Sequence, residues 1–115
     1  MKERRTEERK FLTYFSRVVD RSNGRMLGYL VDLTTGGAQL VGNIQLKVNN
    51  IFQLRIDLPD GFSVHEFLDL DARAAWVAPD TDPEFFRTGL QLVSVPPEHT
   101  ETLKQLLEQY GAPGA

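Results

Sequence analysis

The sequence contains no cysteine, only two histidines and one tryptophan, and no long apolar run. Without cysteine, disulfides, thiolate metal ligands and cysteine nucleophiles are excluded, and the chain suits a reducing compartment. No apolar segment approaches the roughly 20 residues of a membrane-spanning helix, and the charged N-terminus lacks the pattern of a secretory signal. We therefore expect a cytoplasmic protein that does not insert into a membrane.

An excess of positive charge is also missing, since the net charge is −3. Broad binding to DNA, RNA or anionic membranes selects a basic surface, so these partners are not expected. The charge is unevenly placed. Residues 1–10 carry five basic and three acidic side chains, a net of +2, which leaves −5 for residues 11–115. A basic end on an acidic body indicates a local anion site rather than a polyanion track.

Catalysis has little support in the sequence. His65 and His99 show no ligand-like spacing, so we expect neither a metal site nor a catalytic histidine. No serine lies in a recognisable nucleophile motif, and Trp76, which ends an alternating apolar stretch, is interpreted as a core residue. Solvated charge is the default for three carboxylates on the polar faces of alternating strands, Asp57, Asp69 and Asp71. We expect no enzyme and no cofactor.

Short alternating segments separated by turn signals dominate the chain. The segments predicted as strands are residues 11–19, 25–31, 38–41, 51–59, 68–76 and 85–93. Only after Pro96 and Pro97 does the apolar spacing become helical, with Gly111 as a stop. Strands followed by one terminal helix favour a small antiparallel barrel, with the helix capping one opening or covering a flank.

Three arginines lie within six residues near the start of the chain, in Arg4-Arg5-Thr6-Glu7-Glu8-Arg9. A guanidinium is a planar fork of donors, so such a stretch can clamp phosphates or the edge of a guanine. Alone, it is equally typical of a solvated tail in which glutamates pair with the arginines. A second polar pattern follows one predicted hairpin later, Asp32-x-Thr34-x-x-Gly37.

In this order and separation, Arg5-x-x-x-Arg9 and Asp32-x-Thr34-x-x-Gly37 resemble the two-part signature of the PilZ domain family, R-x-x-x-R followed by D/N-x-S-x-x-G. Each half is common by chance, but the pair is fairly specific. Residues 29–38, the strand that ends at Trp76, and residues 86–92 also resemble PilZ strands, so the likeness covers most of the chain.

The resemblance implies an all-β fold, a six-stranded antiparallel PilZ-type β-barrel with a C-terminal α-helix and a flexible N-terminal arm. Residues 1–10 would form the arm, 11–110 the barrel and helix, and 111–115 a loose tail. It also implies a bacterial second-messenger receptor or adaptor that binds cyclic di-GMP on the outside of the barrel.

By the resemblance, Arg5 and Arg9 would contact the phosphates and a guanine, whose acceptor edge suits a guanidinium. In the family, an arginine at the position of Arg4 goes with capture of two stacked ligand molecules. We therefore expect an intercalated dimer of the dinucleotide in one site.

The turn would supply the opposite side of the site. Asp32 would accept a hydrogen bond from a guanine N–H group, and Thr34 would offer a hydroxyl. Gly36 and Gly37 are expected to bind ligand too, with Gly37 allowing close approach of backbone to the purine. Thr34 stands where the pattern has serine, and its extra methyl group could crowd the base. Near residue 49 an asparagine replaces a glycine common in relatives, although asparagine tolerates the same turn geometry.

Ligand binding would order the arm and alter the surface shown to an unidentified downstream protein partner. We expect a monomer or weak homodimer. Two alternatives remain open from the sequence: a PilZ-like scaffold that docks a protein without nucleotide, and a small barrel that binds single-stranded nucleic acid. The acidic body disfavours the second.

Overall fold

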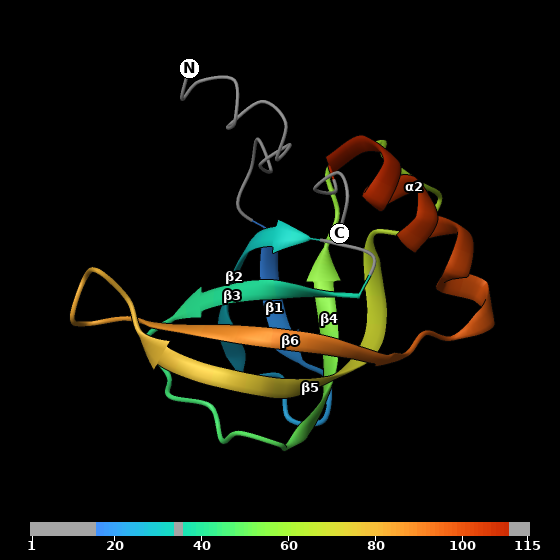
Figure 1. Cartoon of the computed structure of the whole chain (residues 1–115). Helices are drawn as coiled ribbons and strands as arrows, with labels where there is room; N and C mark the ends of the chain where they lie inside the picture. Colours follow the sequence, from blue (N-terminus) through green and yellow to red (C-terminus); the bar gives the residue numbers. More distant parts are fainter. Residues whose placement is uncertain (1–15, 34–35, 111–115) are drawn as a thin grey trace.

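The computed structural model describes residues 16–33 and 36–110, and within them the chain forms a closed antiparallel barrel (Figure 1). The strands follow the order β1-β2-β3-β6-β5-β4 around the barrel. Their bounds are β1 (Ser16–Asp20), β2 (Met26–Leu33), β3 (Gly37–Gly42), β4 (Ile51–Asp57), β5 (Phe67–Pro79) and β6 (Phe86–Ser94). The closed antiparallel barrel of six strands expected from the sequence is confirmed.

The alternating pattern of the sequence becomes the inside and outside of this barrel. Along β4, Leu54 and Ile56 are buried, and along β5 the side chains of Leu68, Leu70 and Ala72 are buried in turn. A period of two places alternate side chains on one face, so closing the sheet collects the apolar set inside. The core is therefore aliphatic.

The predicted strand boundaries were wrong at the turn that carries the second motif. Strand β2 continues through Asp32 to Leu33, whereas the sequence suggested a break after residue 31. Its register with β3 shifts between Leu30 and Asp32, which absorbs one extra residue into the pairing. Residues 1–10 of the expected arm, residues 11–15 of the first predicted strand and the tail 111–115 lie outside the described residues.

Strand β5 holds the clearest correction, at Trp76. The register of β5 on β6 shifts between Ala74, which pairs with Leu90, and Trp76, which pairs with Gly89. An extra residue in one strand reverses which face the following side chains occupy. Ala74 is fully buried but Trp76 is 43% exposed. The interpretation of Trp76 as a core residue is therefore wrong.

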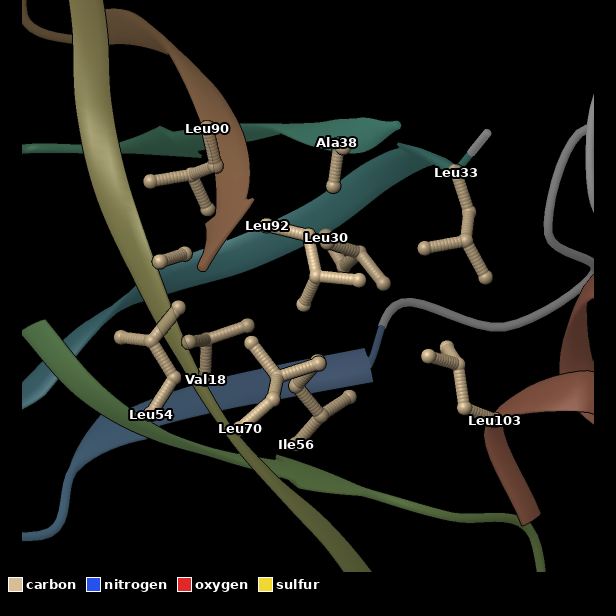
Figure 2. Close-up of a pocket in the computed structure, with 12 residues that line it drawn as sticks. Val18, Leu30, Leu33, Ala38, Leu54, Ile56, Leu70, Leu90, Leu92 and Leu103 are labelled. Atoms are coloured by element: carbon tan, nitrogen blue, oxygen red, sulfur yellow. The ribbon is translucent and has the colours of Figure 1, made fainter. Parts of the chain in front are cut away.

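Helix α2 (Thr100–Tyr110) follows a single 3-10 turn at Pro97–His99 and closes one end of the barrel. Leu106 is fully buried. Figure 2 shows Leu103 of α2 facing the interior beside Leu33, where the apolar lining encloses a space of about 30 Å³. Of the two placements expected for the helix, capping an opening is the observed one. None of the helices in residues 16–33 and 36–110 is long and apolar enough to cross a membrane.

An ion-pair ladder covers the outer face of β4 and β5. Arg55 donates to both carboxylate oxygens of Asp69, at 2.8 and 3.0 Å, and Arg21 donates to Asp71 at 2.8 Å. The hydrogen bond from Arg55 holds the pKa of Asp69 below its ordinary value, against a smaller opposing effect of burial. Asp69 is thus a paired carboxylate, which corrects the expectation of simple solvation.

The two histidines meet beside this ladder. The rings of His65 and His99 stack with centroids 4.6 Å apart, and His99 Nδ1 accepts the Asp69 backbone N–H at 3.1 Å. These contacts tie the start of α2 to β5. Within the described parts of the chain, no group of three histidine or acidic side chains is arranged to hold a metal ion. The pair contributes to helix docking.

A surface hollow beside the second motif

A hollow of about 270 Å³ opens on the outer face of the barrel where β2, β3, β5 and β6 meet. We call it the Trp76 hollow. Its lining consists of Asp32, Gly36, Gly37, Ala38, Gln39, Ala75, Trp76, Gly89, Leu90 and Gln91. Three of the residues singled out by the motif therefore share one concave site with the tryptophan.

Asp32 sits at the end of β2 with only 9% of its surface exposed. One carboxylate oxygen, Oδ1, accepts the Leu33 backbone N–H at 2.9 Å. The turn is also fixed to β6, because Leu92 donates its backbone N–H to the Gly36 carbonyl at 3.1 Å. The Leu33 backbone thus holds the Asp32 carboxylate, and the β6 backbone holds Gly36.

The two glycines of the motif differ in whether the fold leaves room for a side chain. A Cβ at Gly37 would overlap the Leu90 carbonyl oxygen, so the contact between β3 and β6 itself requires glycine there. A Cβ at Gly36 would meet nothing within 4 Å. Gly36 is therefore the glycine whose open side faces space that a ligand can use.

Trp76 forms the aromatic wall of the hollow. A Cβ at Gly89 would collide with the indole ring of Trp76, which shows that the ring lies against the Gly89 backbone. Glycine on one strand therefore makes room for an aromatic ring from its neighbour, a recognised way of supporting a glycine in a sheet. The sequence alone does not indicate this contact, because Trp76 and Gly89 become cross-strand partners only through the shift in register.

Two guanidiniums lie next to the hollow, each bonded to one of its amide side chains. Arg73 donates to Gln91 and, at 2.8 Å, to Asn49. Arg87 donates to Gln39 at 2.8 Å. Asn49 has the positive φ of 76° that a glycine would also accept, which confirms the turn geometry expected for it. A carboxylate, an aromatic face and nearby cations suit a planar ligand that carries both N–H donors and negative charge.

The structure therefore unites Asp32, Gly36 and Gly37, and adds Trp76 and Gln91, which the sequence reasoning did not assign to the site. Arg4, Arg5, Arg9 and Thr34 lie outside the described residues, so their assignment to the ligand stays a prediction.

The described residues thus form a closed barrel with a helix at one end and a polar, aromatic hollow on its outer wall. Comparison with known proteins gives the family. The family model of the PilZ domain matches residues 3–109, and the chain belongs to this family, whose members are binding and adaptor proteins of the cyclic di-GMP type.

A solved structure with the same fold is that of the Bacillus subtilis inhibitor of motility MotI/DgrA. The TM-score is 0.64 at 14% sequence identity, and the match covers 86% of this chain. The chain spans about half of that structure, 49% of its length. A search of curated proteins gave no match. At this identity the likeness concerns the fold alone.

Proposed function

We propose that this protein is a receptor for cyclic di-GMP, which binds in the Trp76 hollow and is closed over by the arginine motif Arg5-x-x-x-Arg9. One observation carries the proposal. Asp32, Gly36 and Trp76, which come from separate strands and a turn, line the same hollow in a chain of the PilZ family that also retains both arginines.

Each group has a task that its chemistry suits. The Asp32 carboxylate accepts from guanine N–H groups, and a purine stacks on the exposed face of Trp76, where stacking of a base typically contributes about 1–3 kcal/mol. Arg5 and Arg9 hold phosphate oxygens or a guanine edge through paired hydrogen bonds. Thr34 offers its hydroxyl to the same ligand.

The size of the hollow is informative. At about 270 Å³ it lies just below the roughly 300–1,000 Å³ that encloses a whole small-molecule ligand. It therefore receives one part of the dinucleotide, and the arginine arm covers the rest. Closure of the arm changes the surface offered to a downstream protein, and Arg4 recruits a second, stacked nucleotide molecule.

Isothermal titration calorimetry with cyclic di-GMP tests this function. We expect saturable heat with two nucleotides per chain, one per chain in Arg4→Ala, and no measurable binding in Arg5→Ala or Arg9→Ala. The matched control is Arg25→Ala, an exposed arginine in the turn between β1 and β2, which should bind as the unaltered protein does. Cyclic di-AMP serves as the ligand control, because adenine lacks the guanine N–H groups from which the Asp32 carboxylate would accept hydrogen bonds.

Absence of heat from the unaltered protein at high micromolar cyclic di-GMP would overturn the proposal and favour a nucleotide-independent docking scaffold. A stoichiometry of one that is insensitive to Arg4→Ala would leave the receptor in place but remove the role given to Arg4.

A further inference from the structure

A second hollow lies on the outer wall of the barrel, between strands β2 and β3 and the loop that joins β5 to β6. We call it the acidic groove, and its main lining residues are Met26, Tyr29, Val31, Val41, Asp82 and Phe85. Its volume of about 560 Å³ is twice that of the Trp76 hollow. In Figure 1 the loop that forms one wall, residues 80–85, projects beyond the barrel at the left.

The floor of the groove is backbone. A Cβ at Gly28 would overlap the Val41 carbonyl oxygen, and a Cβ at Gly42 would overlap that of Leu27. Strands β2 and β3 thus approach closely only because both positions lack side chains, and Gly28 takes a φ of 152° to allow it. Two glycines across one strand pair leave a depression that neighbouring side chains surround.

Apolar side chains form the sides. Met26 is 37% exposed and Tyr29 is 41% exposed. Tyr29 pairs directly with Val41 across β2 and β3, and Phe85 faces them from the loop with partial exposure. Apolar side chains gathered around a hollow, rather than scattered singly, mark interaction surfaces.

The charge beside this apolar surface has one dominant sign. The loop 80–85 contains three carboxylates and no basic residue. Asp80, which also lines the groove, lies 3.7 Å from Arg87, and the Asp82 carboxylate accepts the backbone N–H of Glu84, in the same loop, at 3.1 Å. The rim therefore attracts cations and repels nucleotides, nucleic acids and anionic lipid surfaces.

We infer that the acidic groove docks a segment of a partner protein in which an aromatic or branched aliphatic side chain is flanked by lysine or arginine. The apolar side chain enters between Tyr29 and Phe85, and the basic neighbours meet Asp80 and Asp82. Complementary charge at the rim steers and orients such a segment, and burial of the central side chain holds it.

A defined peptide probe tests this inference on the full chain. The probe is a synthetic hexapeptide, acetyl-Ser-Lys-Phe-Leu-Lys-Ser-amide, titrated into isotopically labelled protein while backbone amide signals are followed by NMR. We expect saturable shifts in β2, at Val41 to Asn43 and in the loop 80–85. The dissociation constant should increase at least fivefold in the double variant D80N/D82N. The matched control is Asp57→Asn, an exposed carboxylate on β4 away from the groove, which should leave peptide binding unchanged.

Three results would overturn the inference. One is the absence of shifts at millimolar peptide, and another is equal binding of a probe with glutamate in place of lysine. The third is that the same amides shift when protein alone is concentrated, which would assign the groove to a second copy of this chain. Because none of these readouts uses a nucleotide, failure of the groove and failure of the cyclic di-GMP site are distinguishable.

Discussion

The Trp76 hollow and the acidic groove are built on the same two strands, β2 and β3, and open on the outer wall of one barrel. Their linings differ. The first holds one fixed carboxylate, an exposed indole and two amides bonded to guanidiniums, whereas the second combines apolar side chains with a loop of three carboxylates, one of which lies 3.7 Å from Arg87. The first suits a planar anion and the second a cationic, apolar peptide.

The difference between the two linings follows from what lies against the glycines of each hollow. In the Trp76 hollow, the indole ring of the neighbouring strand lies where a side chain at Gly89 would be, so the ring forms one wall of the hollow. In the acidic groove, the absence of side chains at Gly28 and Gly42 lets the backbones of β2 and β3 approach closely, so the floor of the groove is backbone. A glycine of this barrel therefore supports an aromatic ring where a tryptophan lies opposite it, and leaves exposed backbone where a second glycine lies opposite it.

One side chain touches both sites. Arg87 donates to Gln39 of the Trp76 hollow at 2.8 Å and lies 3.7 Å from Asp80 of the acidic groove. Arg55 and Arg21 pair with Asp69 and Asp71 of β5, two carboxylates that line neither hollow and belong to the shared scaffold. These relations allow the two sites to be separated by substitution.

The largest separation is expected from Asp32→Ala. Loss of hydrogen bonds to a charged acceptor costs about 2–3 kcal/mol, so cyclic di-GMP should bind on the order of 100-fold more weakly. The peptide probe should bind as before, because Asp32 does not line the acidic groove. Calorimetry with both ligands measures the contrast. Equal weakening of both would mean that the substitution disturbs the barrel rather than one site.

Trp76→Ala should follow, with a loss of about 2 kcal/mol in cyclic di-GMP binding, since one stacked base is removed from its platform. Trp76→Phe keeps an aromatic face and should recover most of the affinity. Val93→Ala, another exposed apolar side chain on the barrel, is the matched control. If alanine and phenylalanine at position 76 bind equally well, the ring is not a stacking surface.

Gly89→Ala tests the platform without touching the indole. Its new methyl group would occupy space that the Trp76 ring fills, so the flexible side chain must move away from the sheet. We expect about 1 kcal/mol weaker nucleotide binding, as for a strained rotamer, together with a shifted Trp76 emission spectrum. Unchanged affinity and an unchanged spectrum would show that the ring does not rest on Gly89.

Asp69→Asn addresses the scaffold that both sites share. Its carboxylate has a lowered pKa in the folded state, so its contribution to stability is present above pH 3.8, the ordinary value, and is lost as the pH falls through the lower folded pKa. Because Arg55 is 39% exposed, we expect a loss of only about 1 kcal/mol in the free energy of unfolding at neutral pH. Both ligands should still bind. Urea unfolding at pH 7 and pH 3 measures this, and the stability difference between the two proteins should shrink at the lower pH.

The smallest effect is expected from Arg87→Gln, at about 0.5 kcal/mol for each ligand, because exposed ion pairs contribute little. The informative result is the direction in which each affinity changes. Loss of the guanidinium should weaken cyclic di-GMP slightly and strengthen the basic peptide slightly, since Asp80 loses its cation. A change of the same sign for both ligands would contradict the charge difference between the two sites.

Much of the fold was readable from the sequence because the alternating pattern of β4 and β5 leaves few alternatives to a closed antiparallel sheet. Asp32, Gly36 and Gly37 were singled out by their resemblance to a family motif, and the structure places them in one hollow, while their contact with a ligand stays a prediction. Trp76 was misplaced, because a bulge adds one residue and reverses the facing of the strand, and no local pattern announces it. The acidic groove was missed for a related reason, since Gly28 and Gly42 become neighbours only through pairing of β2 with β3.

Trp76 is the only tryptophan in the chain, so its fluorescence reports directly on the proposed site. The measurement that tests the central claim is a titration of intrinsic tryptophan fluorescence with cyclic di-GMP, run beside calorimetry on the same sample. We predict saturable quenching that follows the calorimetric isotherm and is absent in Asp32→Ala. Fluorescence that stays constant while calorimetry shows saturation would place the nucleotide elsewhere on the molecule and contradict the account.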